Sequence, residues 1–165
     1  LQKKQKILCA KFRKGHFEGV LGVINQFLKI VKAKYIFLGE KDFQQIYLIK
    51  SFIKNKFKIK VISCSTIRNI NYFAYSSRNL LLKQNDVKNA TLIINYIKNF
   101  RNLIIKKKMN YSELINIKKK ILNYCKKIDY LEIRNKNNLS KNFNRKNFKI
   151  FIAFYIKNIR LIDNF

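Results

Sequence analysis

The side chains best suited to chemistry gather in three short segments. The first, GEKDFQQ at residues 39–45, holds two of the eight acidic residues and the last of the four glycines. The second, AYSSRN at 74–79, places two hydroxyls directly before an arginine. The third, RKGHFEGV at 13–20, contains the single histidine and two glycines. Because the rest of the chain is rich in Lys, Asn, Ile and Phe, these segments are the candidates for a site.

The 39–45 segment has the composition of an anion site at the start of a helix. Backbone N–H groups at a helix N-terminus attract anions, and Lys41 adds a positive charge beside them. Asp42 and Gln45 would then face hydroxyl or carboxylate groups of a ligand. The structural alternative is that Asp42 caps the helix with Gln45 at its N3 position, and that Gly39 only makes a turn.

The 74–79 segment combines short hydroxyl donors with a guanidinium fork. Ser76, Ser77 and Arg78 together would cradle a phosphate or an oxyanion, although a serine-capped turn before a helix has the same composition. His16, in the third segment, is either a ligand-facing side chain or one that packs locally, and a single histidine cannot form a metal site. No GxSxG, Walker A or HExxH motif is present, so any catalysis must act through positioning and charge neutralisation.

The elements around these segments alternate between helix and strand. Apolar residues recur at helical spacing over 20–31, with Val20, Val23, Ile24, Phe27, Leu28 and Val31 on one face. A strand is predicted at 34–39, a helix from about Asp42 to Asn55, and an alternating strand at 57–63. This order predicts a parallel α/β sheet. Ligands bind at the carboxyl ends of such strands, which is where GEKD lies.

The second half of the chain has an α+β pattern. Helices are predicted from about Asp86 to Lys107 and from an N-cap at Ser112 onward, followed by strands at 130–134 and 150–156 that flank a polar loop at 135–147. The first helix would bury Val87, Ala90, Ile94 and Ile97. We place the domain boundary near residues 66–80 and assign 1–66 and 67–165 to two domains.

Composition limits the function classes. Hydrophobic residues make up 48% of the chain, which is enough for a packed core. The net charge of +29 would suit a nucleic-acid partner, but the lysines are spread evenly, and the absence of Pro and Trp indicates an AT-rich genome. We therefore expect no specific nucleic acid. The three separated cysteines and the short apolar runs predict a cytoplasmic protein without disulfides, metal site or membrane span.

The three segments, in this order and at this spacing, resemble the pantothenate synthetase (pantoate–β-alanine ligase) family. RLIDN at 160–164 is similar to the family's C-terminal signature, so the resemblance covers essentially all 165 residues. It implies part of a Rossmann-like nucleotidyltransferase domain followed by a small α+β domain. It also implies a cytoplasmic homodimeric ligase of coenzyme A biosynthesis. ATP, with Mg²⁺, would convert pantoate to pantoyl adenylate and diphosphate, and β-alanine would then release AMP to give pantothenate.

The resemblance assigns roles residue by residue. Lys41 would reach the phosphates, Asp42 the ribose and Gln45 pantoate, while His16, with Arg13, would lie near the pantoate side. Stabilisation of the phosphate charge would fall to Lys41, Ser76, Ser77 and Arg78. The implied ATP-binding residues are Gly39, Glu40, Lys41, Asp42, Ile67, Tyr75, Ser76, Ser77 and Arg78, with no metal ligand among them.

Some positions depart from the family pattern. Tyr75 stands where Leu or Met is usual, and Ser65 where Pro is usual. The family's His-x-Gly-His signature and first pantoate-binding Gln lie in an N-terminal half that has no counterpart here. We therefore expect a C-terminal part of the enzyme that is inactive alone. The alternatives are a degenerate, non-catalytic relic and a basic nucleic-acid-binding protein.

Overall fold

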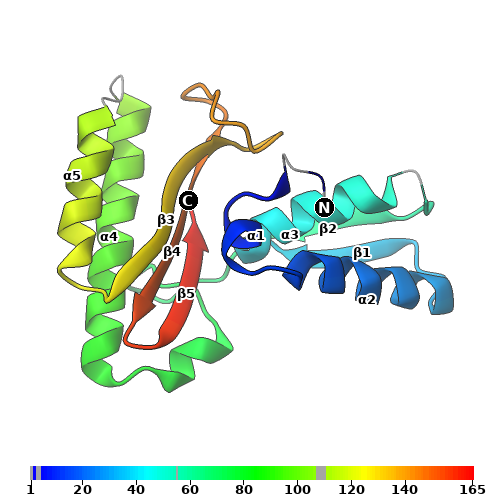
Figure 1. The fold of residues 1–165 in the computed structure, drawn as a ribbon, viewed down its shortest axis with the longest axis horizontal. Helices are drawn as coiled ribbons and strands as arrows, with labels where there is room; N and C mark the ends of the chain where they lie inside the picture. Colours follow the sequence, from blue (N-terminus) through cyan, green and yellow to red (C-terminus); the bar gives the residue numbers. More distant parts are fainter. Residues whose placement is uncertain (1, 3–4, 55, 107–110) are drawn as a thin grey trace. The chain divides into compact units, whose positions relative to one another are not determined.

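The computed structural model describes residues 2, 5–54, 56–106 and 111–165. The chain divides into two compact units, Leu1–Thr66 and Ile67–Phe165, which are described separately (Figure 1). Among the described residues, no helix is both long enough and apolar enough to cross a membrane.

The first unit is built on a parallel strand pair. Its elements are α1 (Cys9–Phe12), α2 (His16–Ile30), β1 (Tyr35–Gly39), the 3₁₀ turn η2 (Glu40–Asp42), α3 (Phe43–Ile53) and β2 (Lys60–Cys64). Strands β1 and β2 pair in parallel from Tyr35 opposite Lys60 to Gly39 opposite Cys64. Parallel neighbours need a crossover connection, and α3 provides it. The predicted α/β arrangement is confirmed, with Gly39 and Cys64 at the shared carboxyl edge.

The core of the first unit uses only part of the predicted apolar face of α2. Leu28 packs with Ile49 and Ile53 of α3, and these are joined by the partly buried side chains of Val20, Leu21, Ile24, Leu38, Phe52, Phe57, Ile59 and Val61. Val23 and Phe27, expected on the same face, are 56% and 60% exposed. The apolar stripe of α2 is wider than the surface that α3 and the two strands cover, so its outer side stays exposed.

Two element boundaries in this unit differ from the prediction. The helix expected from Asp42 begins with η2 and becomes α-helical only at Phe43. It ends at Ile53, and Asn55 lies outside the described residues. Strand β2 starts at Lys60 rather than at Phe57, although Phe57 and Ile59 still face the core.

The second unit packs two helices against a three-stranded antiparallel sheet. It contains η3 (Ser77–Leu81), α4 (Gln84–Lys106), α5 (Tyr111–Leu122), β3 (Lys127–Asn135), β4 (Phe148–Ile156) and β5 (Ile159–Asn164). The strand order is β3-β4-β5. In Figure 1, α4 and α5 lie side by side along one face of this sheet.

The main core of the protein lies between α4 and this sheet. Ala90, Ile94 and Ile97 are fully buried, as predicted, and Val87 packs at the edge of the same cluster. Strand β5 was not predicted, because its residues Ile159–Asn164 alternate apolar and polar side chains only briefly. Ser112 lies inside α5, which begins at Tyr111, and the predicted helix end at Lys107 lies outside the described residues.

A pair of substitutions on α4 tests this core. Ile97 is fully buried, whereas Leu103 on the same helix is 45% exposed. We expect Ile97→Ala to lower the free energy of unfolding by about 2–5 kcal/mol, because it leaves a cavity. We expect Leu103→Ala to cost less than about 1 kcal/mol. Urea unfolding measures both, and equal losses would contradict the assigned helix face.

Candidate functional site

The GEKD segment forms the turn between a parallel strand and the following helix. Gly39 is the last residue of β1, and Glu40–Asp42 make the single 3₁₀ turn η2 that leads into α3. Asp42 occupies the N-cap position of α3, but its side chain makes no capping hydrogen bond within the described part of the chain. The structural alternative, in which this carboxylate caps the helix, is therefore wrong. The Asp42 residue is exposed at the edge where a ligand would approach.

Gly39 has no local reason to be glycine. Its φ of −71° suits any residue. A side chain built there would meet no atom of the described residues within 4 Å. The strand end is therefore open above its backbone, with half-buried Lys41 and exposed Asp42 following it in the chain. An open backbone of this kind permits close approach by a ligand.

The two neighbouring glutamines of α3 have different surroundings. Gln44 is 6% exposed, and its Nε2 donates to the carbonyl oxygens of Ile7 at 2.8 Å and Gln5 at 3.3 Å. Its Oε1 is buried without a hydrogen-bond partner in the described part of the chain. Gln45, in contrast, is half-buried. Gln44 therefore holds the N-terminal segment against α3, a role that sequence analysis did not assign, and Gln45 is the more accessible of the two.

His16 is held by a neighbouring arginine at the start of α2. The Arg13 Nη1 and His16 Nε2 atoms are 2.7 Å apart. Because a guanidinium only donates, Nε2 must be the acceptor and the imidazole proton lies on Nδ1. The ring also packs against Phe17, with 4.9 Å between the ring centroids. Local packing of His16 is thus present, and Arg13 fixes the tautomer of its ring.

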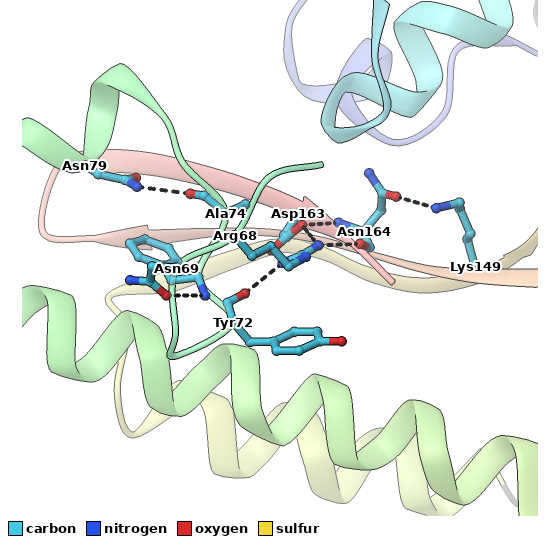
Figure 2. A network of polar contacts seen from close by, with 9 residues as sticks. Arg68, Asn69, Tyr72, Ala74, Asn79, Lys149, Asp163 and Asn164 are labelled. Carbon is cyan, nitrogen blue, oxygen red and sulfur yellow. Dashed lines mark hydrogen bonds and ion pairs between the residues drawn. The ribbon is translucent and has the colours of Figure 1, made fainter. Parts of the chain in front are cut away.

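The second unit brings Ile67 and Tyr75 together at the base of a short loop. The Tyr75 amide donates to the Ile67 carbonyl at 3.1 Å, and Arg68 and Ala74 form an antiparallel bridge. Within the loop, the Phe73 amide donates to Asn69 Oδ1 at 2.9 Å (Figure 2). Ile67 is 75% exposed and Tyr75 63% exposed, so both present apolar surface to solvent.

The serine–arginine segment continues from this loop into η3. Ser76 is the N-cap of η3, and its Oγ accepts a hydrogen bond from the Arg78 amide at 3.4 Å. The serine-capped turn is therefore present. The guanidinium of Arg78 donates from Nη1 to the Arg160 carbonyl at 2.7 Å. Since a guanidinium has five N–H donors, this single bond aims the exposed Arg78 without using its capacity for an anion.

The predicted residues thus form two groups. Gly39–Asp42, Gln45 and His16 belong to the first unit, and Ile67 and Tyr75–Arg78 belong to the second. Each group contains at least one cationic side chain together with hydrogen-bonding side chains, a composition that suits a polyanionic ligand. Among the described residues, no cluster of three or more His, Cys, Asp or Glu side chains could hold a metal ion.

The comparison with known proteins decides the family. The family model for pantoate-beta-alanine ligase matches residues 1–165. The chain belongs to this family. The pantothenate synthetase of Francisella tularensis subsp. mediasiatica is 38% identical over 160 residues, which cover 96% of this chain and 53% of that protein. The Leptospira interrogans pantothenate synthetase is 39% identical over 163 residues, or 96% of this chain and 57% of that protein. The chain therefore spans about half the length of these relatives.

Solved structures agree with this membership. The crystal structure of pantoate-beta-alanine ligase from Francisella tularensis, complexed with beta-gamma ATP and beta-alanine, is 34% identical, with a TM-score of 0.79 over all of this chain and 56% of that one. Pantothenate synthetase from Thermus thermophilus is 24% identical, with a TM-score of 0.85 over 98% of this chain and 60% of that one. The Thermus comparison supports the fold alone.

Thiol reactivity tests the geometry of both units. Cys64, at the carboxyl end of β2, is exposed, whereas burial raises the pKa of the Cys125 thiol to about 11. We expect iodoacetamide at pH 8 to modify Cys64 first, because only the thiolate reacts. Alkylation of Cys125 should accelerate about tenfold per pH unit up to its pKa. Peptide mass spectrometry measures both rates, and Cys64→Ser is the control. Faster alkylation of Cys125 than of Cys64 at pH 8 would contradict the structure.

Proposed function

We propose that this chain supplies ATP- and pantoate-binding residues to a ligase that joins (R)-pantoate to β-alanine, forming pantothenate and releasing AMP and diphosphate. The observation that carries the proposal is the position of Gly39–Asp42 at the carboxyl edge of the β1–β2 pair, directly before α3. Ligands of open α/β sheets bind at this edge. The related Francisella structure contains a beta-gamma ATP and beta-alanine.

In this proposal the first unit binds the nucleotide phosphates and pantoate. The open backbone at Gly39 admits the triphosphate, Lys41 neutralises it, and Asp42 accepts from the ribose hydroxyls, with Glu40 completing the turn. Gln45, one position after the structural Gln44, donates to pantoate. His16 lies toward the pantoate side, with its tautomer fixed by Arg13.

The second unit carries further proposed nucleotide-binding residues. The exposed side chains of Ile67 and Tyr75, joined through their backbone, offer an apolar surface for the adenine. Ser76, Ser77 and Arg78 follow directly and would contact the phosphates and the departing diphosphate. Tyr75, in place of the usual Leu or Met, supplies an aromatic ring that can stack on a base.

The reaction needs positioning and charge neutralisation rather than a protein nucleophile. A carboxylate oxygen of pantoate attacks the α-phosphorus, the bond from this phosphorus to the bridging oxygen breaks, and diphosphate leaves. The amine of β-alanine then attacks the acyl carbon, and AMP leaves. Lys41, Ser76, Ser77 and Arg78 are suited to the first step, because fixed donors stabilise the charge that develops on the phosphates.

Mg²⁺ would accompany ATP in this scheme. Magnesium is usually held by one or two carboxylates together with substrate phosphates and water, rather than by a protein cage. The described residues fit this pattern, because they offer no cluster of three ligating side chains that could form such a cage. When bound, the ion would neutralise phosphate charge. A homodimeric state and a cytoplasmic location are part of the same proposal.

Lys41→Ala tests the nucleotide assignment. In the full-length protein, we expect it to reduce pantoate-dependent ATP–pyrophosphate exchange by at least about 100-fold, the usual cost of removing one stabilising donor. The thermal unfolding midpoint should change little. Lys58→Ala, which removes an exposed positive charge from the same unit, is the matched control and should retain exchange. Normal turnover together with lost thermal stability in Lys41→Ala would make Lys41 structural.

The adjacent glutamines provide a second test. Gln45→Ala should raise the pantoate KM about tenfold or more, because a hydrogen bond to a charged ligand is lost, with little effect on folding. Gln44→Ala should instead lower the free energy of unfolding by about 1–3 kcal/mol, since two carbonyl oxygens lose their donor. Steady-state kinetics and urea unfolding separate the two effects. The reverse pattern would exchange the two roles.

A further inference from the structure

We infer that Arg68 is the positioning residue of the second proposed nucleotide-binding segment, residues 67–79, and that it acts through its ion pair with Asp163. The inference deepens the proposed function and rests on it. Arg68 lies directly after Ile67, and its guanidinium reaches the C-terminal strand 95 residues further along the chain (Figure 2). Arg68 holds the loop that carries Ile67 and Tyr75, and no ligand contact is proposed for Arg68 itself.

The ion pair has the geometry of a strong, directional contact. Arg68 Nη1 lies 2.7 Å from Asp163 Oδ2, and Nη2 lies 2.8 Å from Oδ1, so the contact is bidentate. Nη2 also donates to the Asn164 carbonyl at 3.0 Å. The side chains are only 17% and 3% exposed, so water competes weakly. A bidentate fork fixes orientation as well as distance, and β5 thereby sets the direction of Arg68.

The same guanidinium also binds the loop from within. Arg68 Nη1 donates to the Tyr72 carbonyl at 2.9 Å. Tyr72 has a φ of 67°, a left-handed conformation that a bulky residue rarely adopts without surrounding support. That support comes from Arg68 and from Lys98, whose Nζ lies 3.6 Å from the centroid of the Tyr72 ring. One side chain therefore joins the tip of the loop to the terminal strand.

Two neighbouring aromatic rings favour arginine over lysine at this position. The Arg68 guanidinium carbon lies 4.5 Å from the Phe165 ring centroid and 5.6 Å from the Tyr72 centroid. A planar guanidinium can stack on rings while it donates in its own plane, whereas a lysine ammonium makes a single point contact. Lysine would keep the charge but lose the fork and the stacking.

A few backbone and side-chain hydrogen bonds link Arg68 to the proposed nucleotide-binding residues. Arg68 follows Ile67, whose carbonyl accepts from the Tyr75 amide. Ala74 pairs with Arg68 in the antiparallel bridge. Its carbonyl oxygen accepts a hydrogen bond of 3.0 Å from Nδ2 of Asn79, which belongs to η3. Arg78 is separately held by the Arg160 carbonyl of β5. The nucleotide segment is thus fastened to β5 at two points, and Arg68–Asp163 is the buried one.

The test compares two buried ion pairs of the same sheet. Asp163→Asn breaks the Arg68 pair, and Asp129→Asn breaks the matched pair with Arg160, whose distance is also 2.7 Å and whose side chains are 11% and 5% exposed. We expect both variants of the full-length protein to lose similar thermal stability. Only Asp163→Asn should speed amide hydrogen exchange over 67–79 at least tenfold and raise the ATP KM at least tenfold. Its KM for pantoate should stay within twofold, because the proposed pantoate contacts belong to the first unit. Arg68→Lys, which keeps the charge, should show a smaller change of the same kind.

Three results would overturn the inference, and they differ in what they reject. Unchanged loop exchange in Asp163→Asn and Arg68→Lys would show that the pair does not order the loop. Equal rises in ATP KM for Asp163→Asn and Asp129→Asn would show a general stability effect. Faster loop exchange with an unchanged ATP KM would show that the loop is ordered by the pair but does not bind nucleotide, which rejects the proposed function of this segment. If Asp163→Asn does not fold, Arg68→Lys decides by the same measurements.

Discussion

The buried carboxylate of Asp163 is a strong constraint on the structure of the second unit. A carboxylate that is 3% exposed needs a cation close by, because an unpaired buried charge is costly. Removing one partner of a buried pair typically costs about 3–5 kcal/mol. Arg68 provides the cation from the first residues of the unit, so the loop after the domain boundary must return to the last strand. The positions of Tyr75 and Ser76 follow from that return.

A different constraint governs the first unit. A parallel strand pair cannot be closed by a tight turn and needs a crossover element. Here α3 fills that role and brings Gly39 and Cys64 to the same edge. The turn between β1 and α3 is therefore placed by the fold, and among the described residues the Asp42 side chain makes no capping hydrogen bond there. Residues 40–42 remain partly or fully exposed, where they can bind a ligand.

Periodicity predicted most of the elements, because burial acts on every residue of a regular face. The α4 pattern of Ala90, Ile94 and Ile97 identified a helix that is fully buried at those positions. The same reasoning failed for Phe27, since a pattern shows that a face is apolar but not how much of it is covered. The short strand β5 was missed for a related reason, because six residues give too little alternation.

The candidate site was predictable to the extent that its residues are contiguous. The GEKD and SSR segments differ in composition from the rest of the chain, and their residue types alone predict anion-binding sites. The partners that hold them were not visible. Arg68 and Asp163 are separated by 95 residues, and the Nε2 of Gln44 bonds to carbonyl oxygens rather than to side chains. No local signal in the sequence marks such contacts, because they are decided by tertiary packing.

The central proposal is that the GEKD segment and the Ile67–Arg78 segment each bind ATP. Amide hydrogen exchange of the full-length protein, measured with and without ATP, tests it most directly, because it reports contact without requiring turnover. The account predicts slower exchange on ATP addition over residues 39–45 and 67–79, with the α4–sheet core unchanged. Protection confined to other parts of the chain, or none in either segment at saturating ATP, would contradict it.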